Sequence, residues 1–518
     1  MSKPVAIAVT TLLTVGLLVS CGSSDQSAPE SSPAPTTSPT AGASVAPAWK
    51  PCGVKVPKEV VAGLDERRAA AVRARECATI AVPVDYGRAD GPTIQLAITR
   101  IRSADAGRRL GSVVYNPGGP GASGLDTVAG MATRYRDVLE RYDLVSWDPR
   151  GAAASAPLTC GSSGDGADAL PPGVPTTDAQ WAALGAAAQQ FGRQCAKSGG
   201  ELLKHLGLFD SARDLDRVRA AVGDDKLHYV GVSYGGQLGA AYAELFPDRV
   251  GRMVLDGPGT PARTYEQTLL DQAAGAELGF QQLVASCLAK PPCALGRSLS
   301  DAKAKLGAFL TKLDAKPLPT RQAQQPLTRV GVVSAISTGI TDPPLWPQLA
   351  QSLAAAYQGS GDGLLLFATA IGRRPDGSRS NLPTINSAVN CLDHPGAITV
   401  EKVRAAVPKF AQVSPLFGPV SALRLLECVG WPEAGVGRER PIDGEGAAPI
   451  VVVGNTGDPL GRYEWAQELA TMLRSAKLLT WQGTGHGAYG QIDTCVDKAV
   501  NKYLLTDEPP AAQTCPAR

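Results

Sequence analysis

The sequence predicts an α/β protein with a mostly parallel central sheet flanked by helices and a mainly helical cap inserted into it. Three observations indicate this class. Short runs rich in β-branched residues alternate with longer amphipathic stretches. Most of the short runs end in loops rich in Gly, Asp or Asn, as expected for buried parallel strands. Residues 256–449 form a mainly helical stretch that is too long for a single crossover between neighbouring strands.

The predicted strands fall into two groups. Residues 79–84 and 93–101 predict a leading antiparallel pair. Six further runs predict buried parallel strands, at residues 112–115, 144–147, 227–232, 252–255, 450–453 and 477–481. Sites in open α/β sheets are assembled beyond the carboxyl ends of such strands. Catalytic or binding residues are therefore expected in the loops that follow these runs.

The helical stretch divides the chain into parts. We expect residues 49–260 to form the first part of the core, residues 261–431 the helical cap and residues 432–518 the rest of the core. Breaks rich in proline at residues 290–292 and 316–319 separate helices within the cap. The cap is expected to lie over the edge of the sheet that carries the site.

The first residues have the layout of an export signal. Lys3 precedes an apolar run over residues 5–19, and residues 1–20 are predicted to be the signal peptide. Its Leu-Val-Ser-Cys ending resembles the lipobox of bacterial lipoproteins. This resemblance predicts a protein on the outer side of the cell membrane, anchored by a lipid on Cys21. An ordinary secretory signal beside a chance cysteine is the alternative. Residues 21–48 contain the lipidated cysteine and a flexible linker rich in Ser, Pro and Ala.

Charge excludes one class of partner. The chain has 50 basic and 48 acidic side chains and a formal net charge of +2. This balance produces no field strong enough to make nucleic acid or an anionic membrane surface the main partner. Contact with the membrane is expected through the lipid anchor only, because no second apolar run reaches the ~18 residues that a membrane span needs.

The cysteines predict disulfide bonds. Ten of the eleven cysteines remain after Cys21, an even number in a chain that is predicted to be exported. Among the many pairings that ten thiols allow, proximity in the sequence suggests Cys52–Cys77, Cys160–Cys195, Cys287–Cys293, Cys391–Cys428 and Cys495–Cys515. A metal site is disfavoured, because the chain contains no C-x-x-C pair and only four histidines.

A candidate nucleophile follows one of the parallel strands. The strand at residues 227–232 runs into Gly-Val-Ser-Tyr-Gly-Gly at residues 231–236, and a helical pattern follows. This is G-x-S-x-G in the strand–turn–helix context of a nucleophile elbow. The small neighbours let strand and helix approach closely while the serine hydroxyl points out of the sheet. We therefore predict that Ser233 is the nucleophile.

A serine hydroxyl needs a histidine base and a carboxylate that orients the base. Asp458 follows the strand at residues 450–453, and His486 follows the strand at residues 477–481, in the order acid and then histidine. We predict that these residues complete the triad. Asp256, which follows the strand after the elbow, is a competing acid, but the Gly-Asp-Pro setting favours Asp458.

Two backbone amides should form an oxyanion hole. One is expected from Tyr234, the residue after the nucleophile. The other is expected from residues 116–124, Asn-Pro-Gly-Gly-Pro-Gly-Ala-Ser-Gly, a segment called the glycine loop below. Its glycines allow an amide to approach the substrate without collision. Gly119 is the favoured donor, and Gly118 is the neighbouring alternative.

Together these motifs resemble the prolyl iminopeptidase-like α/β-hydrolases, and within them the exported tripeptidyl aminopeptidases of actinobacteria and their mycobacterial relatives. Residues 118–121 look like the family's H-G-G-P-G loop, with Pro117 in place of its histidine, and residues 148–151 look like its D-x-R-G turn. The elbow and the two loops that carry Asp458 and His486 match as well. The resemblance implies cleavage of one to three residues from a free peptide N-terminus through an acyl-enzyme, without metal or organic cofactor.

Two other functions stay open. A carboxylesterase or lipase acting on small ester substrates would use the same triad. A non-catalytic binding lipoprotein is less consistent with the sequence, because a binding module has no need of nucleophile, acid, base and both oxyanion loops.

An aminopeptidase must also hold the substrate's ammonium group, which calls for enclosed carboxylates without a competing cation. Asp393 and Glu427 adjoin Cys391 and Cys428, which form one of the suggested disulfides. The sequence predicts that these two acids lie near each other and bind the substrate N-terminus. Solvated or structural roles for either acid are the alternative.

Overall fold

The computed structural model describes residues 46–161, 171–322, 324–374, 377–433, 442–490 and 494–517. The predicted export signal, Cys21 and the predicted linker as far as residue 45 lie outside the described residues. No helix within the described ranges is long and apolar enough to cross a membrane.

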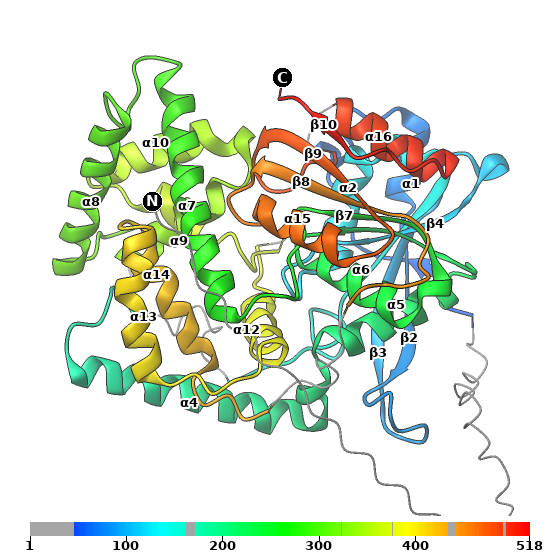
Figure 1. Cartoon of the computed structure of the whole chain (residues 1–518), viewed down its shortest axis with the longest axis horizontal. Coiled ribbons are helices and arrows are strands. Elements are labelled where there is room, and N and C mark those ends of the chain that lie inside the picture. The colour runs from blue at the N-terminus through cyan, green and yellow to red at the C-terminus, as the bar shows by residue number, and fades with distance from the viewer. Residues whose placement is uncertain are drawn as a thin grey trace, which may run out of the picture. The chain divides into compact units, whose positions relative to one another are not determined.

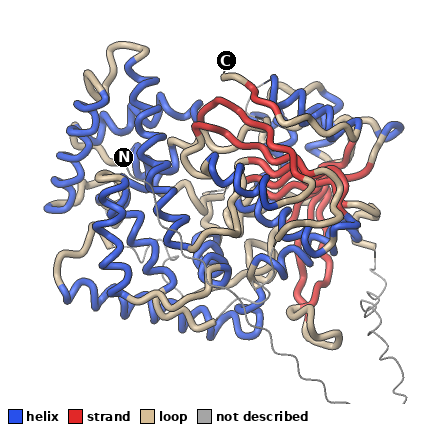
Figure 2. Tube along the Cα trace, in the orientation of Figure 1, coloured by secondary structure: helices blue, strands red, loops and turns tan. Residues whose placement is uncertain are grey.

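A single twisted sheet runs through the core, and its strands are drawn in red in Figure 2. The strands are β1 (Lys50–Pro51), β2 (Glu76–Pro83), β3 (Thr93–Ile101), β4 (Gly111–Asn116), β5 (Tyr142–Trp147), β6 (Leu227–Val232), β7 (Val250–Asp256), β8 (Ile450–Gly457), β9 (Ala476–Thr484) and β10 (Gln513–Cys515). Their order across the sheet is β1-β2-β3-β5-β4-β6-β7-β8-β9-β10. Strands β2 and β3 pair antiparallel, and the neighbours from β5 to β10 pair parallel.

All eight predicted strands are confirmed, as are the antiparallel pair and the parallel group. The burial of each strand explains its sequence pattern. Strands β4 and β5 are buried at every position, including the polar residues Ser112, Asn116 and Asp143, whereas β2 alternates between buried and exposed residues. The short strands β1 and β10 were not predicted, because two or three residues are too few to show an alternation of apolar and polar residues.

Helices cover both faces of the sheet (Figure 1). One face packs against α5 (Leu208–Ala221), α6 (Tyr234–Leu245) and α15 (Tyr463–Met472). The opposite face packs against α1 (Glu66–Arg73), α2 (Gly124–Arg134), α3 (Arg136–Leu139) and α16 (Thr494–Thr506). The sheet is thereby buried on both sides, which is the α/β-hydrolase arrangement that the sequence predicted.

The cap lies between β7 and β8 in the chain and beside the sheet in space (Figure 1). Its helices are α7 (Tyr265–Leu288), α8 (Leu299–Ala315), α9 (Arg329–Gly339), α10 (Trp346–Tyr357), α11 (Asp362–Ala368), α12 (Leu382–Asp393), α13 (Val400–Val413) and α14 (Gly418–Leu423), followed by the short 3-10 helix η7 (Arg424–Cys428). The cap has an apolar core of its own, in which Phe280 of α7 contacts Phe417.

One further helix belongs to the cap layer by its packing. Helix α4 (Asp178–Gly199) precedes the elbow in the sequence, within the range that was expected to form the first part of the core. Its Trp181 is buried in one cluster with Tyr265 of α7 and Phe410 of α13. Figure 1 shows α4 running along the cap below α13. The cap layer is therefore built from two separate parts of the chain.

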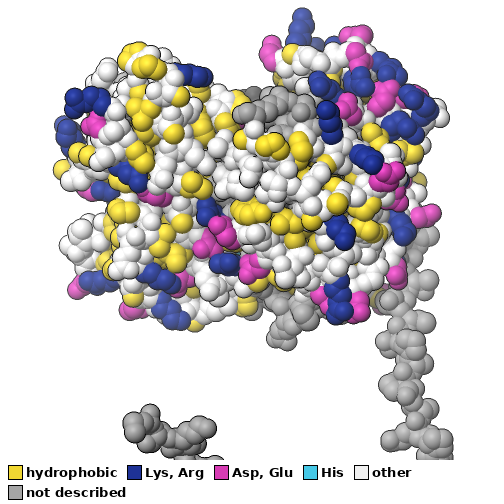
Figure 3. Space-filling view, turned by 45° about the horizontal axis from the view of Figure 1, so that its top comes forward, with side chains coloured by type: hydrophobic (Ala, Val, Ile, Leu, Met, Phe, Trp, Pro, Cys, Tyr) yellow, Lys and Arg dark blue, Asp and Glu magenta, His cyan; other side chains and the backbone are white. Residues whose placement is uncertain are grey.

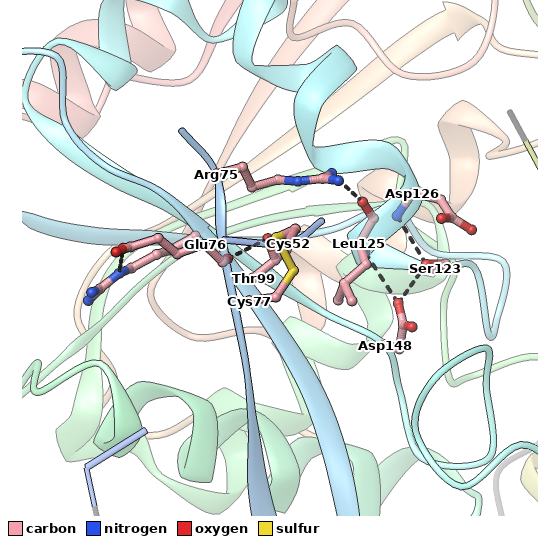
Figure 4. Close-up of a disulfide and its surroundings, with 10 residues drawn as sticks. Cys52, Arg75, Glu76, Cys77, Thr99, Ser123, Leu125, Asp126 and Asp148 are labelled. Atoms are coloured by element: carbon pink, nitrogen blue, oxygen red, sulfur yellow. Dashed lines mark hydrogen bonds and ion pairs between the residues drawn. A yellow bond between two sulfur atoms is a disulfide. The ribbon is translucent and has the colours of Figure 1, made fainter. Parts of the chain in front are cut away.

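The five suggested disulfides are all present, so the pairing by proximity is confirmed. Cys52–Cys77 joins the residue after β1 to β2 (Figure 4), and Cys391–Cys428 joins α12 to η7. Basic and acidic side chains are intermingled on the face drawn in Figure 3.

Candidate active site

Ser233 occupies the sharp turn between β6 and α6. Its backbone has φ 59° and ψ −122°, a left-handed conformation that is strained for a residue with a side chain. The turn is possible because its neighbours are small. A methyl group built at Gly231 would lie 2.2 Å from the carbonyl oxygen of Gly235, and one at Gly235 would lie 2.7 Å from that of Asn116. The predicted elbow geometry therefore depends on these glycines.

Asp458 and His486 meet on the loops that follow β8 and β9. Nδ1 of His486 lies 3.0 Å from Oδ1 and 2.9 Å from Oδ2 of Asp458. A carboxylate can only accept hydrogen bonds, so Nδ1 carries the proton and donates it. In the neutral ring, Nε2 is then the nitrogen that can accept a proton.

Backbone amides fix the carboxylate of Asp458, which is 1% exposed. Oδ1 accepts hydrogen bonds from the amides of Leu460 and Gly461, each at 2.8 Å. Oδ2 accepts one from Gly487, next to the histidine, at 3.0 Å. These bonds satisfy a buried carboxylate and set its orientation toward the imidazole.

The electrostatics favour a protonated imidazole more than in water. Burial lowers the pKa of His486, but the charge and hydrogen bond of Asp458, with the charge of Asp256, outweigh burial. The net effect raises the pKa of His486 above its ordinary value of 6.5. The site thus stabilises the imidazolium that forms when a base accepts a proton.

The competing acid Asp256 makes different contacts. Its carboxylate accepts hydrogen bonds from the amides of Ala488 at 2.9 Å and Tyr489 at 2.9 Å. Burial raises the pKa of Asp256 to about 7, against the lowering effect of these two amides. Its backbone carbonyl also accepts from the amide of Ser233 at 2.9 Å. Asp256 therefore hydrogen bonds to the loop after His486 and to the elbow, whereas Asp458 is the acid that is hydrogen bonded to the imidazole.

The glycine loop packs directly against the elbow. A methyl group built at Gly118 would lie 2.4 Å from the carbonyl oxygen of Val232 and 3.1 Å from the amide nitrogen of Tyr234. The amide of Gly118 donates to Oδ1 of Asn116 at 2.9 Å. This amide is engaged within the loop, which favours Gly119 over Gly118 as the second oxyanion donor.

A residue outside the triad holds the end of the glycine loop. Asp148, from the D-x-R-G turn after β5, accepts hydrogen bonds from the hydroxyl of Ser123 at 2.6 Å and the amide of Leu125 at 3.2 Å (Figure 4). Ser123 in turn caps the first turn of α2. Arg150 of the same turn forms a buried ion pair with Asp214 at 2.6 Å. These contacts could not be predicted from the sequence, because the D-x-R-G turn matched only as a family motif.

The cap touches both triad loops. The amide of His486 donates to the carbonyl of Thr341 at 2.8 Å, and a methyl group built at Gly485 would lie 2.6 Å from Pro343. In α7, one built at Gly275 would lie 2.1 Å from the carbonyl oxygen of Pro459, next to the acid. The cap is in van der Waals contact with the loops that carry Asp458 and His486.

The two acids predicted to bind an ammonium group have other partners. Asp393 is 2% exposed and accepts hydrogen bonds from the amide of Leu208 at 2.8 Å and the hydroxyl of Tyr234 at 2.7 Å. Glu427 accepts from Ser387 at 3.0 Å and lies 3.5 Å from Nε of Arg424. A substrate ammonium would have to compete with Arg424 for Glu427. Asp393 contacts the elbow instead of lining an open surface.

Comparison with known proteins places this arrangement in a family. Residues 414–515 match the family described as TAP-like protein. The chain is 34% identical over 484 residues to serine protease Hip1 of Mycobacterium tuberculosis, with 90% of each chain covered. It is 34% identical over 492 residues to carboxylesterase B of the same species, covering 91% of this chain and 90% of the relative. It is 31% identical over 458 residues to tripeptidyl aminopeptidase of Streptomyces lividans, covering 83% and 81%.

Solved structures with lower similarity include a hydrolase from Pseudomonas aeruginosa, with 14% identity, a TM-score of 0.35 and coverage of 83% of this chain and 98% of that one. Esterase E22 has 10% identity and a TM-score of 0.37, with 83% and 100% covered. The identity to full-length relatives, together with the sheet order and the motifs on it, shows that the chain is a serine hydrolase of the TAP-like family of α/β-hydrolases.

Proposed function

We propose that this enzyme cleaves peptides near a free N-terminus, in the manner of a tripeptidyl or prolyl aminopeptidase, through an acyl-enzyme on Ser233. The observation that carries the catalytic part is the hydrogen bond between His486 and the buried Asp458, on loops beside the strained elbow. The peptide substrate is supported by relatives named serine protease and tripeptidyl aminopeptidase.

In the first half of the reaction, Oγ of Ser233 attacks the carbonyl carbon of the scissile bond, and its proton passes to Nε2 of His486. Asp458 stabilises the imidazolium that results. The negative charge that develops on the carbonyl oxygen is bound by the amides of Tyr234 and Gly119. The intermediate then expels the leaving amine, which takes the proton from His486, and an ester to Ser233 remains.

In the second half, His486 accepts a proton from a water molecule as that water attacks the ester carbonyl. The same two amides bind the second oxyanion. Collapse of this intermediate returns the proton to Oγ of Ser233 and releases the carboxylic acid product. Each proton that enters the imidazole leaves it again, so His486 is returned to its neutral form at the end of every cycle.

Recognition of a free N-terminus requires a carboxylate that the substrate can reach. Of the two predicted acids, Glu427 fits this role better, because Asp393 is enclosed and bound to Tyr234 and Leu208. The side chain of Glu427 is 11% exposed, and its contact with Arg424 is long, at 3.5 Å. We propose that a substrate ammonium competes with Arg424 for this carboxylate.

An ester substrate is the second candidate. It is favoured by the relative named carboxylesterase B, whose identity to this chain equals that of serine protease Hip1. The same triad and oxyanion hole hydrolyse either bond, so the difference lies in how the cap holds the acyl group.

Two measurements test this proposal. A fluorophosphonate probe should label the wild type and not Ser233→Ala, and labelling of that variant would show that Ser233 is not the nucleophile.

A free tripeptidyl chromogenic substrate should be cleaved much faster than its N-acetylated form, and Glu427→Gln should reduce the ratio of the free-substrate rate to the acetylated-substrate rate. Asp314→Asn, which changes an acid paired with Arg329 on the cap, is the matched control. Equal rates on free and acetylated substrates would favour the esterase.

We further propose that the protein is exported and anchored by a lipid on Cys21, as the sequence predicts. Cys21→Ala should then move the enzyme from the membrane fraction to the soluble fraction without loss of specific activity. Unchanged fractionation would show that Cys21 is not the anchor.

A further inference from the structure

We propose that the cap helix α12 positions both halves of the oxyanion hole, and that Asp393 is a positioning residue that acts through Tyr234. This inference rests on the proposed catalytic roles of Ser233, Tyr234 and Gly119. It assigns Asp393 to the elbow and the charge-binding site, in place of the predicted contact with a substrate ammonium.

The C-terminal end of α12 is bound to the elbow. The hydroxyl of Tyr234 donates to Oδ2 of Asp393 at 2.7 Å, and the amide of Leu208 donates to Oδ1 at 2.8 Å. Both carboxylate oxygens therefore accept from the core, which compensates for burying a group that is only 2% exposed. Tyr234 supplies one oxyanion amide from its own backbone. A bond that fixes its ring also restrains that amide.

The middle of α12 packs on the glycine loop, which supplies the other amide. A methyl group built at Gly121 would lie 2.1 Å from Cγ2 of Ile385, and one at Gly119 would lie 3.5 Å from Cδ1 of Leu382. The side-chain amide of Asn386 donates to the carbonyl of Pro120 at 3.4 Å. The loop is thus held between the elbow on one side and α12 on the other.

A small cavity marks the junction of these three segments. Its lining includes Tyr234 from the elbow, Gly118 and Pro120 from the glycine loop, and Ile385 and Val389 from α12. Residues from α12, the glycine loop and the elbow therefore meet around one small cavity.

The helix itself is fixed at both ends. Asn381, the residue before α12, accepts from the amide of Ala153 at 2.9 Å and donates to the carbonyls of Gly151 at 2.8 Å and Leu158 at 2.9 Å. At the other end, Cys391 is bonded to Cys428. An element restrained in this way can hold two amides at a constant separation, which an oxyanion hole requires.

The test compares two tyrosines of the same helix. Tyr234 and Tyr242 both lie on α6, and both donate to buried aspartates, Tyr234 to Asp393 at 2.7 Å and Tyr242 to Asp216 at 3.1 Å. Only the first bond joins the elbow to the cap. Tyr234→Phe and Asp393→Asn are the test variants, and Tyr242→Phe is the matched control.

We expect Tyr234→Phe and Asp393→Asn each to lower kcat by about tenfold, because a displaced oxyanion donor loses part of the ~10²–10³-fold effect of a complete one. KM should change little, and the double variant should be no slower than the slower single variant. Tyr242→Phe should lower the melting temperature without lowering kcat. Binding of a boronic acid, whose tetrahedral adduct with the serine mimics the oxyanion, should weaken in proportion to kcat.

The inference is wrong if both test variants keep the wild-type kcat, or if Tyr242→Phe lowers kcat as much as they do. Tyr234→Phe keeps the test decisive should Asp393→Asn fail to fold, because it removes only a hydroxyl. Failure of the proposed function has a different signature, which is activity and fluorophosphonate labelling that persist in Ser233→Ala.

Discussion

Nδ1 of His486 lies 2.9 Å from Oδ2 of Asp458, and it also lies 3.0 Å from Oδ1 of the same carboxylate. The pair comes from neighbouring strands, β8 and β9, and each partner is fixed by contacts outside the pair. Asp458 is held by amides of its own loop, and the amide of His486 is held by Thr341 of the cap. The activity of the site should therefore depend on whether His486 is protonated.

The first prediction concerns pH. A histidine base must be neutral to accept a proton from Ser233, and the pKa of His486 is raised above 6.5. The value of kcat/KM should therefore fall as the pH drops through a midpoint above 6.5. The same shift stabilises the fold fully below the unfolded pKa of 6.5, and this contribution is lost as the pH rises through the folded value. A profile that stays flat from pH 8 to 5 would argue against a histidine base.

The second prediction separates the two acids. Asp458→Asn should lower kcat by a factor on the order of 10⁴, because it removes the group that fixes the tautomer of His486. Asp256→Asn should cost far less activity, because Asp256 accepts hydrogen bonds from the backbone amides of Ala488 and Tyr489, whereas Asp458 is hydrogen bonded to the imidazole itself. Steady-state kinetics on one substrate decide between them. Equal losses would mean that both carboxylates act on the imidazole.

The third prediction concerns space beside the base. A methyl group at Gly461 would lie 2.3 Å from the carbonyl oxygen of Gly257 and 2.9 Å from Cε1 of His486. Gly461→Ala should therefore displace the imidazole and lower kcat by at least about tenfold. The control is Gly130→Ala in α2, where a methyl group meets nothing within 4 Å. That change should raise stability by about 0.5–1 kcal/mol and leave kcat unchanged.

The fourth prediction concerns the disulfide next to α12. Cys391 and Cys428 are 37 residues apart, whereas Cys287 and Cys293 are 6 apart. In the loop-entropy account, replacing the first pair by serines should cost about 4 kcal/mol and the second about 2 kcal/mol. Unfolding in guanidinium chloride measures both. If the two losses were equal, the stability of the cap would not depend on the length of the closed loop.

Much of the catalytic core could be predicted because its signals are local. The elbow, the glycine loop and the two triad loops each combine a strand with the few residues that follow it, and parallel strands bring those ends to one edge of the sheet. The eight longer strands were predicted for the same reason. The disulfides also followed proximity, since each pair lies within 37 residues in the chain.

Contacts between distant segments could not be predicted in this way. Asp256 and Asp458 both follow strands. Only the packing of the loops shows that Asp256 hydrogen bonds to the amide of Ala488 after His486, whereas Asp458 is hydrogen bonded to the imidazole. Helix α4 joins the cap although its own sequence precedes the elbow. Side-chain directions and helix packing depend on residues that are distant in the sequence, so a local sequence pattern cannot predict them.

The sequence by itself determined the α/β-hydrolase fold, and it suggested the disulfide pairs and predicted the order of nucleophile, acid and base along the chain. The tertiary structure alone decided what the cap acids touch. Asp393 was predicted to bind a substrate amine, but its carboxylate accepts from Tyr234, 159 residues earlier. The physical reason is that a buried carboxylate takes the donors that folding brings to it, and the partner of Asp393 is set only when α12 packs against the elbow.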